Sequence, residues 1–99
     1  MKGNFDSIIN SDIPVLVDFH ATWCQLCKIQ SPILQEVARE LPGKVKIIKI
    51  DVDKNQQIAI RFQVQGVPTL ALFKNGSLLW KQSGVQNKQQ IISIINANS

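Results

Sequence analysis

The chain has 99 residues, of which 44% are hydrophobic and 18% charged, and it carries a net charge of +4. This length suits one domain with its own core, so we expect a single domain over residues 1–99. The composition excludes a disordered chain, and the lysines are scattered singly among acidic and apolar residues, which argues against a nucleic-acid partner.

The sequence also predicts where the protein works. No run of about 18 apolar residues occurs, and residues 1–10 lack the apolar stretch of a signal peptide, so we expect no membrane partner and a cytoplasmic location. Its two cysteines lie three positions apart, which is not the pattern of a secreted protein held together by disulfides. In a reducing compartment such a pair is typically catalytic or metal-binding.

The chain is expected to start at a helix, followed by a strand over residues 14–20. This segment is β-branched and mostly apolar, which is typical of a strand buried on both faces. The next helix should begin at Cys24, end near Pro42 and be kinked at Pro32. Its inward face repeats at spacings of three and four and consists of Ile29, Ile33, Leu34, Val37 and Leu41.

Residues 45–52 predict a second buried strand. Asp53, with Gln56 three residues later, resembles a capping box that opens a short helix through Phe62. The inward face of this short helix is expected to be Ile58, Ala59 and Phe62.

The last part of the chain predicts a hairpin and a closing helix. Residues 69–73 and 77–82 should pair antiparallel, because Asn75-Gly76 supplies the positive φ angles of a tight turn. Asn87, with Gln90 three residues later, should open a helix with the apolar stripe Ile91, Ile92, Ile94 and Ile95. The order α-β-α-β-α-β-β-α predicts an α/β fold with a central mixed sheet flanked by helices.

Cys24 and Cys27 carry the chemistry that we expect. At positions i and i+3 of the first helical turn, their Cα atoms should lie about 5–6 Å apart, as a disulfide prefers. Cys24 at the helix start should have a stabilised thiolate and act as the nucleophile. Cys27, deeper and more shielded, should attack later and resolve a mixed disulfide with the substrate.

Two other interpretations of the cysteine pair remain open. Zinc needs about four ligands, and outside the pair the chain offers only His20, so a metal site would require a dimer that shares ligands. A permanent structural disulfide would stabilise little, because the closed loop is so short. We expect neither a metal nor an organic cofactor, since no glycine-rich phosphate loop is present.

The run of residues 17–28 resembles the active-site segment of the thioredoxin family, and the resemblance covers nearly the whole chain. Further matches are Pro32, residues 49–53, residues 66–69, residues 73–76 and Gly84. The resemblance implies a thioredoxin fold and a redox-active disulfide. It also implies a monomeric electron carrier that reduces protein disulfides and is recycled by a separate, thioredoxin-reductase-like donor.

The resemblance also implies roles for individual residues. Pro68 should be cis, so that an extended substrate strand can pair with the backbone of Val67. Asp18 lies on an apolar strand, where burial should raise the pKa of its carboxyl, and it would relay the proton of Cys27 with Lys49 as its charge partner. A water-exposed Asp18 and an ordinary trans proline are the alternatives. The substrate-binding residues would be Trp23, Gln25, Leu26, Gly66, Val67, Pro68 and Gly84.

Three features depart from the family pattern. Gln25-Leu26 replaces the usual Gly-Pro, His20 replaces an aromatic residue, and the chain has no room for the family's opening edge strand. Without the proline, a backbone N–H is free to bond to the Cys24 thiolate, and a charged His20 would act in the same direction. Both should make the pair more oxidising. An oxidase or isomerase, or a non-catalytic binding module, therefore remains an alternative, and the exposed sheet edge could form a dimer.

Overall fold

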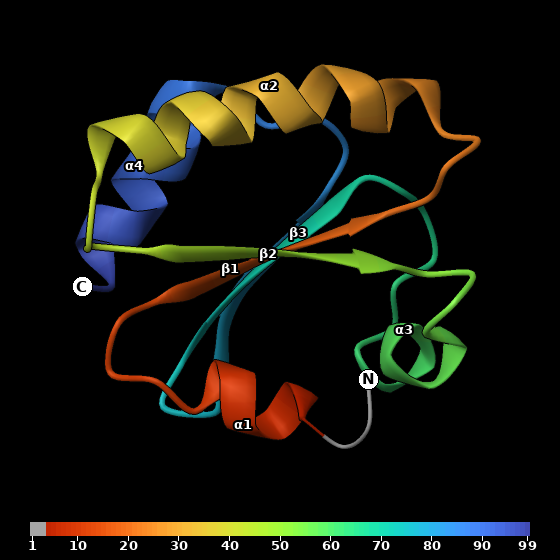
Figure 1. The fold of residues 1–99 in the computed structure, drawn as a ribbon, viewed down its shortest axis with the longest axis horizontal. Helices are drawn as coiled ribbons and strands as arrows, with labels where there is room; N and C mark the ends of the chain where they lie inside the picture. The colour runs from red at the N-terminus through yellow and green to blue at the C-terminus, as the bar shows by residue number, and fades with distance from the viewer. Residues whose placement is uncertain (1–3) are drawn as a thin grey trace.

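Helices and strands follow one another in the predicted order along residues 4–99, the part of the chain that the computed structural model describes (Figure 1). Residues 1–3, which belong to the segment tested above for a signal peptide, lie outside this part. The elements are α1 (Phe5–Ile9), β1 (Val15–His20), α2 (Gln25–Glu40), β2 (Lys46–Asp51), α3 (Gln56–Arg61), β3 (Thr69–Lys74), β4 (Ser77–Ser83) and α4 (Lys88–Ala97).

The strands form one mixed sheet in the order β2-β1-β3-β4. β1 runs parallel to β2 and antiparallel to β3, and β4 completes the hairpin with β3. Figure 1 views this sheet along its edge, with α2 and α4 on one side and α1 and α3 on the other. The predicted α/β architecture is confirmed. β2 is an edge strand of this sheet, and β1 is the first strand within residues 4–99.

β1 separates two apolar cores because its side chains alternate between the two faces of the sheet. Val15, Val17 and Phe19 pack in the core on the side of α1 and α3. Leu16 packs in the core under α2 and α4. Asp18 follows Leu16 by two positions and therefore lies on the face that α2 covers, where its side chain is 1% exposed.

The buried face of α2 differs from the prediction at one position. Cys27, Gln30, Leu34 and Val37 are buried, whereas Ile29 is 54% exposed. The spacing of these buried residues follows the helical period from Cys27, and it places Gln30, for which no burial was predicted, on the inward face. The predicted burial of Ile29 is therefore wrong. The inward face was inferred from apolar residues alone, and that pattern cannot reveal a buried glutamine.

The start of α3 also differs from the prediction. The capping box predicted at Asp53 is wrong, since α3 starts at Gln56 with Asn55 as its N-cap residue. Asp53 belongs instead to a turn in which Oδ1 of Asp51 accepts hydrogen bonds from the N–H groups of Asp53 and Lys54. At α4 the expected cap is confirmed, because Oδ1 of Asn87 accepts a hydrogen bond from the N–H of Gln90.

Two local features of the backbone form as predicted. Asn75 and Gly76 both have positive φ angles, 51° and 82°, and form the predicted hairpin turn between β3 and β4. The peptide bond between Val67 and Pro68 is cis, as the resemblance implied. In the described part of the chain no helix is long and apolar enough to cross a membrane.

Candidate active site

A disulfide joins Cys24 and Cys27 at the start of α2. β1 ends at His20, and the short loop after it delivers Cys24 as the N-cap residue of the helix. The Cα atoms of the two cysteines lie 5.3 Å apart, within the predicted range. Helical spacing therefore allows the pair to open and close with little movement of the backbone.

The sulfur of Cys24 lies where a negative charge is favoured. The N–H of Cys27 donates a hydrogen bond to Sγ of Cys24 at 3.0 Å, and the positive end of the α2 dipole points toward the same atom. The donor expected from the missing proline was the N–H of Leu26. In this disulfide form the donor is one residue later, because an N-cap side chain reaches the second or third N–H of its helix.

The two cysteines are almost equally buried, at 5% for Cys24 and 6% for Cys27. The predicted contrast between an exposed Cys24 and a shielded Cys27 is therefore not seen in the disulfide form. Their surroundings differ instead. Sγ of Cys24 faces the carbonyl oxygen of Val67 at 3.6 Å, whereas Cys27 lines a pocket together with Asp18.

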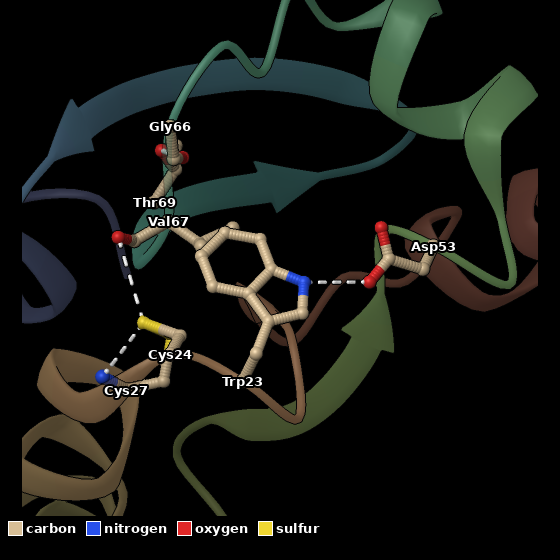
Figure 2. Close-up of a disulfide and its surroundings, with 7 residues drawn as sticks. All are labelled: Trp23, Cys24, Cys27, Asp53, Gly66, Val67 and Thr69. Atoms are coloured by element: carbon tan, nitrogen blue, oxygen red, sulfur yellow. Dashed lines mark hydrogen bonds between the residues drawn. A yellow bond between two sulfur atoms is a disulfide. The ribbon is translucent and has the colours of Figure 1, made fainter.

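Residues 66–69, which we call the cis-proline loop, lie against Cys24 (Figure 2). The contact between Sγ of Cys24 and the Val67 oxygen becomes a hydrogen bond when reduction gives Cys24 an S–H group. Oγ1 of Thr69 donates a hydrogen bond to the carbonyl oxygen of Gly66 at 2.6 Å, which holds the loop closed. The N–H of Gly84 donates to the carbonyl oxygen of Pro68 at 2.8 Å, so the predicted groove residues of both loops are joined.

Trp23 projects from the loop before Cys24 and is 68% exposed. Its Nε1 donates a hydrogen bond of 2.8 Å to Oδ2 of Asp53, which comes from the segment after β2 (Figure 2). The indole lines a small pocket of about 90 Å³ together with Gly66 and Val67. Leu26, which is 51% exposed, adds a second large apolar side chain beside the disulfide.

Asp18 lies behind Cys27, and its Oδ1 has no hydrogen-bond partner in the described residues. Burial raises the pKa of the Asp18 carboxyl above its usual value, while the nearby charges of His20 and Lys49 act in the opposite direction. Asp18, His20, Cys27 and Lys49 line one pocket of about 210 Å³. The alternative of a water-exposed Asp18 is therefore excluded.

Lys49 is close to Asp18 without contacting it directly. It lies opposite Asp18 in the parallel register of β1 and β2, but its Nζ donates a hydrogen bond of 2.6 Å to Oγ of Ser31. No ion pair joins Lys49 to Asp18 in residues 4–99, so the influence of the lysine on the carboxylate acts through space. The part of the chain covered by the structure also gathers no three His, Cys, Asp or Glu side chains that could hold a metal.

Sequence reasoning missed three polar residues near the site: Asp53, Gln30 and Gln86. Asp53 was assigned to a helix cap and instead orients Trp23. Gln30 and Gln86 are buried and hydrogen-bonded to each other across two segments of the chain. The only signal for Gln30 was its place one helical turn after Cys27, on the face that α2 buries.

Comparisons with known proteins agree with this geometry. The thioredoxin family model matches residues 1–97. The chain is 48% identical over 94 residues to a thioredoxin of Haemophilus influenzae, a match that covers 94% of this chain and 88% of that protein. It is 42% identical over 91 residues to a thioredoxin of Pseudomonas aeruginosa, covering 92% and 84%.

Solved structures give the same result. The fold matches a mutant thioredoxin from Halobacterium salinarum with a TM-score of 0.89 and 32% identity, covering 99% of this chain and 85% of that one. It matches oxidised mitochondrial thioredoxin 3 from Saccharomyces cerevisiae with a TM-score of 0.85 and 33% identity, covering 95% and 87%. With relatives of this kind along nearly its whole length and a disulfide-forming cysteine pair at the start of α2, the chain belongs to the thioredoxin family of thiol–disulfide oxidoreductases.

Proposed function

We propose that this thiol–disulfide oxidoreductase reduces protein disulfides in two exchange steps, with Cys24 as the first nucleophile. In the dithiol form, the Cys24 thiolate attacks one sulfur of the substrate disulfide. A mixed disulfide forms, and the other substrate sulfur leaves as a thiolate. The observation that carries the proposal is the hydrogen bond from the N–H of Cys27 to Sγ of Cys24 at the α2 N-terminus, because it stabilises a negative charge on that sulfur.

Cys27 completes the reaction by attacking Sγ of Cys24. Its thiol first gives its proton to the carboxylate of Asp18, and the new thiolate then displaces the second substrate sulfur. The substrate has gained two electrons, and the Cys24–Cys27 disulfide has formed. The shared pocket of Cys27 and Asp18 supports this role, as does the raised pKa of the Asp18 carboxyl, which brings it closer to the pKa of a thiol. His20 and Lys49 tune this carboxyl through their charges.

The substrate backbone binds along the cis-proline loop. The peptide groups around Val67 lie beside the attacking sulfur and are suited to pair with an extended substrate segment. The remaining members of the substrate surface are Trp23, Gln25, Leu26, Gly66, Pro68 and Gly84. The exposed indole of Trp23 and the exposed side chain of Leu26 support an apolar contact with the substrate on either side of the disulfide.

The partners follow from this chemistry. Substrates are proteins with accessible disulfides, and a separate reductase returns two electrons to the Cys24–Cys27 disulfide after each cycle. The protein acts as a monomer in this proposal, because the Cys24–Cys27 disulfide forms within one chain and the two exchange steps need no residue from a second copy. We infer a reducing compartment, the cytoplasm, because an electron donor of this kind works where its cysteines are kept reduced.

The assignment of the two cysteines is tested by trapping the mixed disulfide. In the Cys27→Ser variant the second step is blocked, so incubation with insulin should accumulate a covalent adduct through Cys24 that mass spectrometry detects. The Cys24→Ser variant is the matched control and should give no adduct and no insulin reduction. An adduct that forms with Cys24→Ser and fails with Cys27→Ser would reverse the two roles.

A further inference from the structure

Two buried glutamines connect the active-site helix to the segment between β4 and α4. Gln30 of α2 is 0% exposed, and Gln86 is 7% exposed. Nε2 of Gln30 donates a hydrogen bond to the carbonyl oxygen of Gln86 at 3.1 Å, and the N–H of Gln86 donates to Oε1 of Gln30 at 2.7 Å. The side-chain amide of Gln30 therefore satisfies both backbone groups of one residue, much as a neighbouring strand would.

The connection continues to the substrate groove. Nε2 of Gln86 donates to the carbonyl oxygens of Ser83 and Gly84, at 3.2 and 3.1 Å. The N–H of Gly84 donates to the carbonyl oxygen of Pro68, the cis proline. We call the set Gln30, Ser83, Gly84, Gln86 and Pro68 the Gln30–Gln86 network. It runs from one turn after Cys27 to the loop that faces Cys24.

Gln30 is a polar residue at a position where an apolar one is usual. It shares the buried face of α2 with Leu34 and Val37, where an apolar side chain would pack without any polar requirement. A buried amide is destabilising unless its polar atoms find partners. Both polar atoms of the Gln30 side chain have partners, and a fully satisfied buried network makes its surroundings rigid. Packing alone does not require a glutamine here.

We propose that Gln30 and Gln86 are positioning residues that hold the substrate groove in shape for protein substrates. The inference rests on the proposed function. By fixing Gln86 to α2, the network sets the distance between the Gly84 segment, the cis-proline loop and the sulfur of Cys24. Val85, which is 37% exposed, lies between the two anchored residues Gly84 and Gln86 and is presented at the surface. An extended protein segment then meets a preformed groove, whereas a small disulfide needs only access to the sulfur.

The test compares a protein disulfide with a small one. Gln30→Met keeps the length of the side chain and removes both hydrogen bonds to Gln86. With insulin as the substrate, the KM is expected to rise about tenfold, equivalent to about 1.4 kcal/mol, while kcat changes less than about twofold. With hydroxyethyl disulfide, the rate constant is expected to stay within about twofold of that of the unmodified protein. Gln35→Met, at an exposed position of the same helix, is the matched control and should leave all values unchanged.

A second variant keeps the test decisive if Gln30→Met fails to fold. Gln86→Met retains the bonds between Gln30 and the backbone and removes only those to Ser83 and Gly84, so the insulin KM should rise about threefold. Equal losses with insulin and hydroxyethyl disulfide would assign the network a general structural role and overturn the inference. Unchanged kinetics with both substrates would also overturn it. If the unmodified protein reduces neither substrate, the proposed function fails instead.

Discussion

Replacing Asp18 by asparagine removes the charge behind Cys27 while keeping the shape of the side chain. The carboxyl is buried, its Oδ1 has no partner in the described residues, and burial raises its pKa in the folded protein. In the unfolded chain this pKa returns to its ordinary value of 3.8. Asp18→Asn therefore changes both the pH dependence of stability and the proton transfer that we assign to Asp18.

The sign of the stability effect follows from the direction of this pKa shift. Between 3.8 and the higher folded-state pKa, the folded protein binds more protons than the unfolded chain, so the free energy of unfolding falls as the pH rises through that window. Below pH 3.8 the group is protonated in both states, and its contribution is fully retained. Because the asparagine amide cannot ionise, Asp18→Asn escapes the cost of keeping a charge buried and should be more stable than the parent at pH 8, by about 1–3 kcal/mol.

The assay is urea denaturation of the parent and Asp18→Asn from pH 3 to pH 9, followed by far-ultraviolet circular dichroism. The stabilisation should be present at pH 8 and largely gone by about pH 4, while Asp12→Asn, at an exposed position, should change stability by less than about 0.5 kcal/mol. Release of the second insulin thiol in a single turnover should also slow in Asp18→Asn. A stability profile parallel to that of the parent at every pH would refute the argument from burial.

Three further changes probe the surroundings of the disulfide. Asp53→Ala frees the indole of Trp23 and should raise the insulin KM about two- to threefold; an unchanged KM would remove this hydrogen bond from substrate binding. His20→Phe removes a charge that lowers the pKa of the Asp18 carboxyl, so that pKa should rise in a carbon NMR titration, and a fall would contradict the electrostatics. Leu26→Pro removes the second N–H that an N-cap thiolate can reach and should lower the reduction potential by about 30 mV. An unchanged or higher potential would show that this N–H does not stabilise the thiolate.

The order of helices and strands could be predicted from the sequence because local signals agree with the final fold. The buried strand ending at His20 is continuously apolar apart from Asp18, and Asn75-Gly76 and Asn87 mark a turn and a cap by their own chemistry. The disulfide between the two cysteines could also be predicted, since positions i and i+3 on the first turn of a helix lie close together. The relatives named thioredoxin favour the reductase over the oxidase, isomerase or binding-module alternatives.

The features that could not be predicted depend on contacts between distant segments. Asp53 carries a capping signal, but the preceding turn around Asp51 delays the helix and leaves the Asp53 side chain free to bind Trp23. Gln30 is buried and Ile29 is exposed, because the backbone of Gln86, 56 residues away, supplies partners for the Gln30 amide. Hydrophobic periodicity contains no information about such partners.

The reduction potential of the Cys24–Cys27 pair decides whether this protein is a reductant, because a reductant of protein disulfides must hold its electrons less tightly than its substrates do. It can be measured by equilibrating the protein with dithiothreitol buffers of known ratio and following the mass of the alkylated dithiol form. We predict a value between about −270 and −200 mV, at or somewhat above that of a thioredoxin. A value near −120 mV, in the range of a strong disulfide oxidant, would contradict it.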